Sequence, residues 1–133
     1  MKVVVVKNRL TDNQKLELGI KPDQSFEWQI TPNKEYVVIS VRNILNSDFY
    51  GNSVLFEIED DYGRLLAVPS CLFAISDSTP SKYWQASIEN AIFSLEPKEF
   101  IDDPSLSEKI LDREPGATSV FDEIKSRLES ESC

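Results

Sequence analysis

The segment 54–68 constrains the fold of this chain more than any other part of its sequence. Residues 54–59 alternate between apolar and polar side chains, which is the pattern of a half-buried strand. The turn sequence Asp60-Asp-Tyr-Gly63 follows, in which aspartate suits a tight turn and glycine takes a positive φ at little cost. Residues 64–68 would return as the partner strand. We therefore predict an antiparallel hairpin, with Val54, Phe56 and Ile58 facing inward and Glu57 and Glu59 facing outward.

Several other short segments also predict strands. Residues 2–6 are rich in valine and have the composition of a central strand. Residues 26–30 alternate strictly, and residues 36–42 and 88–95 complete the set. Residues 11–19 are mostly polar and fit a loop or one helical turn. Together these segments predict a mainly β chain folded as a small barrel or a strongly curved antiparallel sheet.

The C-terminal part of the chain has helical periodicity instead. Ser105 and Glu108 have the spacing of a capping box and would open a short helix that ends near Asp112. From Ser119 onward a last helix should lay Phe121, Ile124 and Leu128 against the sheet or against a partner. We expect a single α+β domain over residues 1–133, with a β-rich part at 1–96 and a helical extension at 97–133.

The whole chain has a formal net charge of −9. Its acidic residues are concentrated in the second part of the sequence. Residues 1–50 hold seven basic and six acidic residues, whereas residues 51–133 hold seven basic and seventeen acidic residues. Nucleic acids and anionic membranes attract basic surfaces, so neither is an expected partner. A basic protein suits this charge distribution better, although the same acidity would also serve solubility alone.

The composition excludes most catalytic chemistry. The chain has no histidine, so it lacks the commonest general base and any histidine-containing zinc site. Its two cysteines, Cys71 and Cys133, are too few for a four-cysteine site, and its four glycines are isolated, so it has no phosphate-binding loop. We therefore predict no catalytic residues, no cofactor and no enzymatic activity.

The sequence also predicts where the protein resides. A signal peptide needs an apolar run of about 7–15 residues and a membrane span needs about 20. The apolar run near the N-terminus consists of only four valines, at positions 3–6 between two lysines, and is too short for either. We expect a cytoplasmic protein without a disulfide, because that compartment is reducing.

Carboxylates around the predicted hairpin turn leave one catalytic route open. Glu57 and Glu59 would share a strand face about 7 Å apart. With Asp60 or Asp61 they could hold a hard cation such as Mg²⁺. Acidic residues before a tight turn are also common on ordinary exposed strands. A carboxylate-dependent metal-binding enzyme is therefore an alternative hypothesis.

Aromatic residues beside these carboxylates suggest a binding surface. Tyr62 lies within the acidic turn, and Trp84 follows a polar loop. Aromatic anchors with a polar rim are typical of protein-binding hot spots, although such rings also fix loops onto a core. We predict a partner-binding surface that consists of Glu57, Glu59, Asp60, Asp61, Tyr62 and Trp84.

The stretch 31–84 resembles a known fold. Ile30-Thr-Pro-Asn-Lys-Glu-Tyr-Val-Val-Ile39, the hairpin through Asp60-Asp-Tyr-Gly-Arg64 and the run Val68-Pro-Ser-Cys-Leu-Phe73 resemble a small SH3-like β-barrel. With Asp77 and Ser81-Lys-Tyr-Trp84, the same stretch is similar to small bacterial proteins, some of which resemble immunity proteins. Such proteins bind and neutralise a toxin domain, so the resemblance implies binding without catalytic residues.

The leading hypothesis is therefore an acidic protein-binding module of the immunity or antitoxin type. Its acidic surface would cover a basic toxin domain. The alternatives are the metal-binding enzyme described above and a structural adaptor subunit that docks through its last helix.

Overall fold

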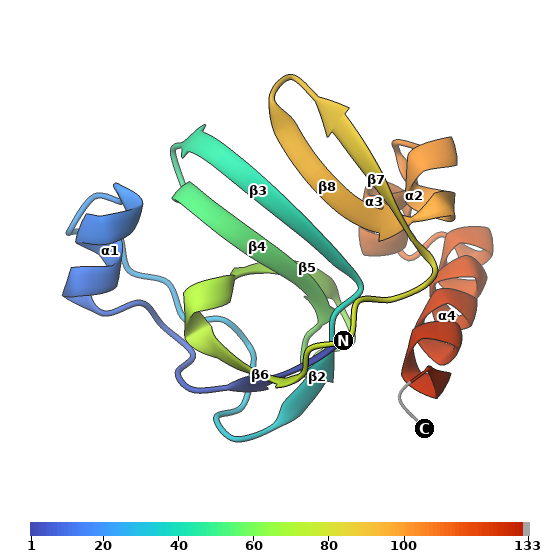
Figure 1. Ribbon diagram of the computed structural model, residues 1–133, viewed down its shortest axis with the longest axis horizontal. Helices are drawn as coiled ribbons and strands as arrows, with labels where there is room; N and C mark the ends of the chain where they lie inside the picture. Colours follow the sequence, from blue (N-terminus) through green and yellow to red (C-terminus); the bar gives the residue numbers. More distant parts are fainter. Residues whose placement is uncertain (132–133) are drawn as a thin grey trace.

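The computed structural model describes residues 1–131 and confirms a mainly β fold with C-terminal helices (Figure 1). A three-stranded antiparallel sheet has the order β2-β1-β6, and a five-stranded antiparallel sheet has the order β5-β4-β3-β8-β7. Among the described residues, hydrogen bonds do not close these sheets into a barrel, so the curved sheet is the architecture observed. The strands are β1 Lys2–Val5, β2 Glu35–Val37, β3 Ser40–Ser47, β4 Gly51–Glu59, β5 Leu65–Pro69, β6 Phe73–Asp77, β7 Trp84–Glu89 and β8 Ile92–Pro97.

The chain passes from one sheet to the other at residues 38 and 39. The N–H of Val38 donates to the Met1 carbonyl at 3.1 Å, whereas the N–H of Ile39 donates to the Glu57 carbonyl at 2.8 Å. The prediction of one continuous strand over residues 36–42 is therefore wrong, because the segment divides between two sheets. A short 3₁₀ helix, η1 Ser70–Leu72, makes a similar passage from β5 to β6.

The predicted hairpin of residues 54–68 is confirmed as β4 and β5, but its faces differ from the prediction. Gly63 has a φ of 77° in the turn, as expected for a tight reversal. Val54 is 44% exposed, because it lies outside the apolar cluster that buries Phe56 and Ile58. Glu57, which was expected to face solvent, is only 8% exposed. The face that carries Glu57 is therefore covered, not open.

Residues 84–97 form a second hairpin where the sequence predicted one strand over 88–95. The turn between β7 and β8 contains Asn90 and Ala91, which have positive φ values of 51° and 65°. Two consecutive positive φ values produce a turn whose twist matches that of the flanking strands. Asn-Gly is the usual sequence for such a turn. Because Ala91 replaces the glycine, the sequence did not predict this turn.

Two expectations in the N-terminal part are also wrong. Residues 11–19 contain a seven-residue helix, α1 Asp12–Leu18, where a loop or one turn was expected. Thr11 and Gln14 form a capping box, and Gly19 ends the helix with a φ of 75°. No residue of α1 is buried, so apolar periodicity does not reveal the helix. Residues 26–30 form no strand, although Trp28 and Ile30 are buried.

Three helices lie on the opposite side of the five-stranded sheet from α1 (Figure 1). The last one begins at Pro115, earlier than the predicted Ser119, because proline suits the first turn of a helix. Its Phe121, Ile124 and Leu128 are buried as predicted, in a cluster with Leu65 of β5. No helix within residues 1–131 is both long enough and apolar enough to cross a membrane. The three helices on this side of the sheet are α2 Lys98–Asp102, α3 Leu106–Leu111 and α4 Pro115–Ser130.

Two details of these regions complete the fold. Ser105 precedes α3 as predicted, but its side chain makes no capping hydrogen bond. Cys71 is exposed and forms no disulfide within residues 1–131, and Cys133 lies outside the described residues.

Candidate functional site

The metal site of the alternative hypothesis is not assembled, because the two strand glutamates have separate partners. Glu57 accepts a hydrogen bond from the Ser40 hydroxyl at 2.5 Å and another from the Arg42 guanidinium at 3.1 Å. Glu59 forms an ion pair with Lys125 of α4. Within residues 1–131, no group of three or more histidine, cysteine, aspartate or glutamate side chains is arranged to hold a metal ion.

Asp60 is a structural element of the hairpin turn. Its side chain is fully buried, and Oδ1 accepts hydrogen bonds from the backbone N–H groups of Tyr62 and Arg64 at 3.0 and 2.9 Å. Its Oδ2 accepts two hydrogen bonds from the Arg64 guanidinium, at 3.1 and 2.9 Å. All four bonds lie within the turn, so this carboxylate stabilises the reversal of the chain.

Asp61 ties the turn to the segment before β2. It accepts hydrogen bonds from the Thr31 hydroxyl at 2.6 Å, the Tyr36 hydroxyl at 2.6 Å and the Lys34 ammonium at 2.8 Å. Partial burial acts to raise the pKa of Asp61, but these three donors outweigh it and lower the pKa from 3.8 to about 2. Asp61 is therefore ionised and internally paired at neutral pH.

The two aromatic residues of the predicted surface differ in exposure. Tyr62 is 63% exposed, and the Arg64 guanidinium carbon lies 5.3 Å from the centre of its ring. The indole N–H of Trp84 donates to the Ile39 carbonyl at 2.8 Å, and its ring lies against the core between the two sheets. As partner contacts these six residues stay a prediction, and Tyr62 is the most open of them.

A polar network, which the sequence did not reveal, lies beneath the helices. Arg42 of β3 lies between two carboxylates, 3.1 Å from Glu57 and 3.9 Å from Glu96 of β8. Burial raises the pKa of Glu96, the charge of Arg42 opposes that rise, and the charge of Glu57 adds to it. Arg42 and Glu96 also line a cavity of about 440 Å³ between this sheet and α2. Residues from three separate strands meet here, so no local motif marks the network.

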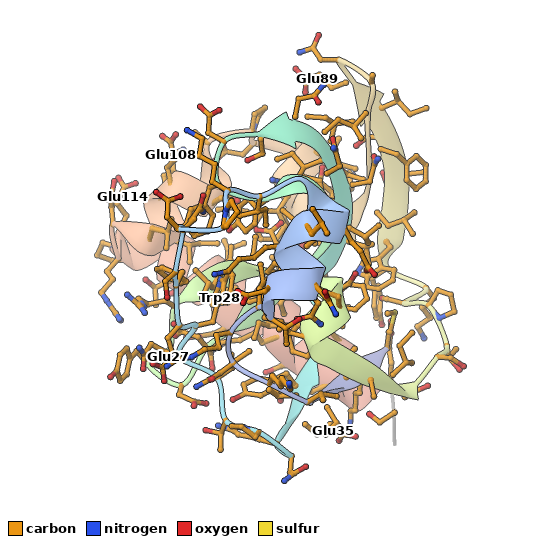
Figure 2. All side chains as sticks on the ribbon, turned by 90° about the vertical axis from the view of Figure 1, so that its left-hand side faces the viewer. Glu27, Trp28, Glu35, Glu89, Glu108 and Glu114 are labelled. Carbon is orange, nitrogen blue, oxygen red and sulfur yellow. The ribbon has the colours of Figure 1, made fainter. Side chains whose placement is uncertain are left out.

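The outer surface of α3 and α4 carries carboxylates of a different kind. Residues 97–131 hold ten acidic and five basic residues, and four of those basic residues form ion pairs. Figure 2 shows Glu108 and Glu114 projecting outward at the same edge of the molecule. Some exposed carboxylates of α3, α4 and the intervening loop form no ion pair with any described residue. We call them the acidic helical face: Glu108, Asp112, Glu114, Glu123 and Glu129.

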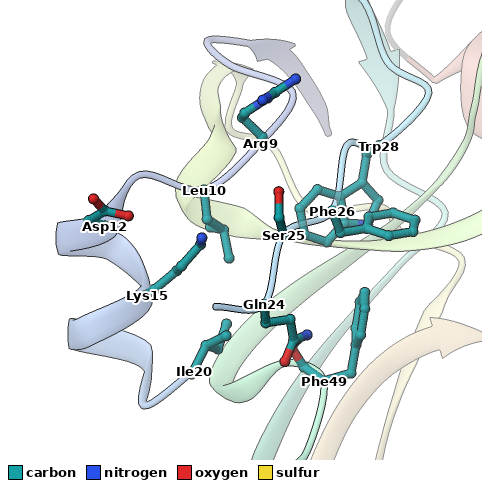
Figure 3. Close-up of a pocket in the computed structure, with 10 residues that line it drawn as sticks. All are labelled: Arg9, Leu10, Asp12, Lys15, Ile20, Gln24, Ser25, Phe26, Trp28 and Phe49. Atoms are coloured by element: carbon teal, nitrogen blue, oxygen red, sulfur yellow. Dashed lines mark hydrogen bonds between the residues drawn. The ribbon is translucent and has the colours of Figure 1, made fainter. Parts of the chain in front are cut away.

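A pocket of about 220 Å³ lies between α1 and the segment 20–28 (Figure 3). We call it the α1 pocket. The rings of Phe26, Trp28 and Phe49 form one side of it, and Figure 3 shows Lys15 extending from α1 toward its interior. Sequence reasoning missed this site because α1 was not predicted and residues 26–30 were assigned to a strand.

Backbone contacts hold the walls of the α1 pocket in place. Gly51, at the start of β4, comes so close to α1 that a Cβ atom there would lie 2.1 Å from the Leu18 carbonyl oxygen. Gly51 also has a φ of 63°, so both space and conformation require glycine. The Gln24 side-chain amide donates to the Phe49 carbonyl at 2.9 Å and joins the loop to the β3–β4 turn.

The aromatic side of the α1 pocket contains an unpaired hydrogen-bond donor. Trp28 is 3% exposed, and its indole Nε1–H has no hydrogen-bond acceptor within the described residues. Its ring meets Phe26 edge to face, with ring centres 4.9 Å apart, and Phe49 at 6.1 Å. A buried N–H without an acceptor is uncommon and costs free energy.

Comparison with known proteins gives no match, whether to a protein-family model, to a curated protein or to a solved structure. The function is therefore argued from the chain's own residues.

Proposed function

We propose that this protein is a cytoplasmic protein-binding module of the immunity or antitoxin type that neutralises a basic toxin domain. The observation that carries this proposal is the acidic helical face. Its five carboxylates are exposed and form no ion pair among the described residues, so their field extends into solvent. Such a field accelerates association with a positively charged partner and disfavours acidic ones.

The helices present these charges on a rigid support. Phe121, Ile124 and Leu128 anchor the inner side of α4, and Leu106 and Ile110 anchor α3. Because the helices are already packed on the sheet, a partner would not have to order them. Binding to a preorganised surface costs less conformational entropy than binding to a mobile segment. The same packing disfavours the adaptor hypothesis, since the apolar side of the last helix is occupied by its own domain.

The hairpin surface has a secondary part in this proposal. Glu57 and Asp60 are buried and paired, so a partner would meet Tyr62 before it met either carboxylate. The exposed tyrosine could add an aromatic contact beside the charged surface.

The test captures the partner and examines it. The tagged protein is used to capture its binding partner from a lysate of the source organism, and mass spectrometry then identifies the captured protein. We expect a protein with a basic domain that stops growth when it is expressed alone and loses this effect when the two are co-expressed. An acidic captured protein, or a toxicity unchanged by co-expression, would contradict the proposal.

A matched pair of variants tests where the partner binds. Glu108→Lys combined with Glu114→Lys changes the charge of the acidic helical face by +4. Glu17→Lys combined with Asp23→Lys makes the same change near α1, with two exposed residues. We expect the first pair to weaken capture and the second to leave it nearly unchanged. An equal loss in both would show that only net charge matters.

A further inference from the structure

The α1 pocket lies at the other end of the molecule from α3 and α4 and has a different chemistry (Figures 1 and 3). One side of it is aromatic, and two of the three charged residues that line it, Arg9 and Lys15, are basic. The third charged residue is Asp12, and no residue of the acidic helical face lines the α1 pocket. Binding at this pocket is therefore independent of the proposed function.

We propose that the α1 pocket binds a small ligand that consists of an aromatic ring carrying a carboxylate. Its volume of about 220 Å³ sets the size of the ligand. An apolar cavity of roughly 150 Å³ holds benzene, whereas pockets for drug-sized molecules begin at roughly 300 Å³. The α1 pocket therefore accommodates one ring with a short polar substituent.

The three rings specify the aromatic part of the ligand. Phe26, Trp28 and Phe49 meet one another edge to face, with ring centres between 4.9 and 6.1 Å apart. An additional ring extends this arrangement, because edge-to-face and offset contacts between aromatic groups are favourable. Phe26 and Phe49 are 44% and 37% exposed, so a ligand can cover apolar surface that now faces water.

One buried donor without an acceptor and one ammonium group favour a carboxylate. The Trp28 indole N–H has no acceptor within the described residues. The Lys15 ammonium carries three N–H donors and, among residues 1–131, has a single hydrogen bond, a long one of 3.3 Å to the Pro22 carbonyl. Arg9 is less available because it pairs with Glu27 at 2.9 Å. A carboxylate accepts several hydrogen bonds at once, so one that reaches the Trp28 N–H satisfies this donor and also brings a negative charge into the pocket that Lys15 enters (Figure 3).

The competing explanation is that the Trp28 N–H interacts with a neighbouring ring instead of a ligand. Phe26 stands at 71° to the indole plane, and an N–H directed at an aromatic face forms a weak hydrogen bond. Because Trp28 is buried, a ligand reaches its N–H only when Phe26 or Phe49 moves aside, which their partial exposure permits.

The two tryptophans allow a direct test by nuclear magnetic resonance. The full-length ¹⁵N-labelled protein is titrated with phenylacetate, and the two indole N–H signals are followed separately. We expect the Trp28 signal to move downfield as it gains an acceptor, with a Kd of about 1 mM given the size of the ligand. The Trp84 signal serves as an internal control, because its N–H already donates to Ile39.

Matched ligands and variants identify the groups involved. Phenylacetamide has the same shape without the charge, and we expect it to bind about tenfold more weakly. Lys15→Gln should weaken phenylacetate binding about tenfold, whereas Lys21→Gln, an exposed lysine outside the pocket, should not. Trp28→Phe assigns the indole signal and keeps an aromatic ring at that position.

Two further results decide the proposal. A peptide ending in phenylalanine presents the same ring and carboxylate, so tighter binding of Gly-Gly-Phe than of phenylacetate would assign the pocket to a protein C-terminus. Tighter binding of phenylacetate would assign it to a free aromatic acid. A Trp28 signal unmoved by either probe, or moved equally by phenylacetamide, would overturn the proposal.

Discussion

The carboxylates of the β4–β5 hairpin and those of the acidic helical face have the same chemistry but opposite surroundings. Asp60 has four hydrogen bonds within its own turn, and Asp61 has three from the neighbouring segment. Glu108 and Glu114 face solvent and have no ion pair within residues 1–131. A paired carboxylate can stabilise a fold, whereas an unpaired one among like charges repels its neighbours. The comparison therefore assigns a folding role to Asp60 and Asp61, and it leaves the acidic helical face as the surface that we propose for binding.

The strongest way to break this comparison is to remove the Asp60 side chain. In Asp60→Ala the backbone N–H groups of Tyr62 and Arg64 lose their acceptor, and the guanidinium of Arg64 loses its ion pair. We expect the free energy of unfolding to fall by about 2–4 kcal/mol, measured by urea denaturation. Asp112→Ala on the helical face is the matched control and should change it by less than about 0.5 kcal/mol. Equal effects would contradict the division between the two regions.

Removal of Glu57 should have the next largest effect. Glu57→Ala leaves the buried Ser40 hydroxyl without its acceptor and leaves Arg42 with only the more distant Glu96. We expect a loss of about 1–3 kcal/mol in the free energy of unfolding. The pKa of Glu96 should also fall, because the negative charge of Glu57 helps to raise it. Carbon-detected titration of the Glu96 carboxyl group measures this change, and a constant pKa would show that the two groups do not interact.

The sequence predicts elements better than it predicts which of their faces are open. Local signals were sufficient for the β4–β5 hairpin, because its alternation and its Asp-Asp-Tyr-Gly turn lie within one short segment. They were also sufficient for the buried side of α4. They failed for Glu57, because its partners Ser40 and Arg42 lie on another strand and reach it only after folding. The α1 pocket was not predicted for the same reason, because Phe49 and Trp28 come into contact only after folding.

A smaller effect is expected at Asp61, and it depends on pH. Its pKa in the folded protein is about 2, below its ordinary value of 3.8, so its hydrogen bonds stabilise the fold above pH 3.8. That contribution is lost as the pH falls through about 2. At pH 7 we expect Asp61→Ala to be less stable than the unchanged protein by about 1 kcal/mol, because the site is partly exposed. Urea denaturation from pH 7 to pH 2 should show this difference disappearing. Glu123→Ala should show no such convergence, and a difference that persisted at pH 2 would mean that the ionised carboxylate is not its source.

Charge reversal on the acidic helical face should have little effect on the stability of the fold and a large effect on partner binding. Glu108→Lys with Glu114→Lys removes no side-chain hydrogen bond or ion pair of the described residues, but Glu108 lies in the first turn of α3 and Glu114 directly precedes α4, where a positive charge opposes the helix dipole. The free energy of unfolding should therefore fall by no more than about 1 kcal/mol. Association with the captured basic partner should nevertheless slow, because the attractive field is weakened. Salt should reduce the association rate of the unchanged protein more than that of the variant, since ions screen exposed charges within about 10 Å at 0.1 M. Stopped-flow measurements at low and physiological salt test both statements. A variant that folds normally and associates at an unchanged rate would place the partner elsewhere, with the exposed Tyr62 as the next position to examine.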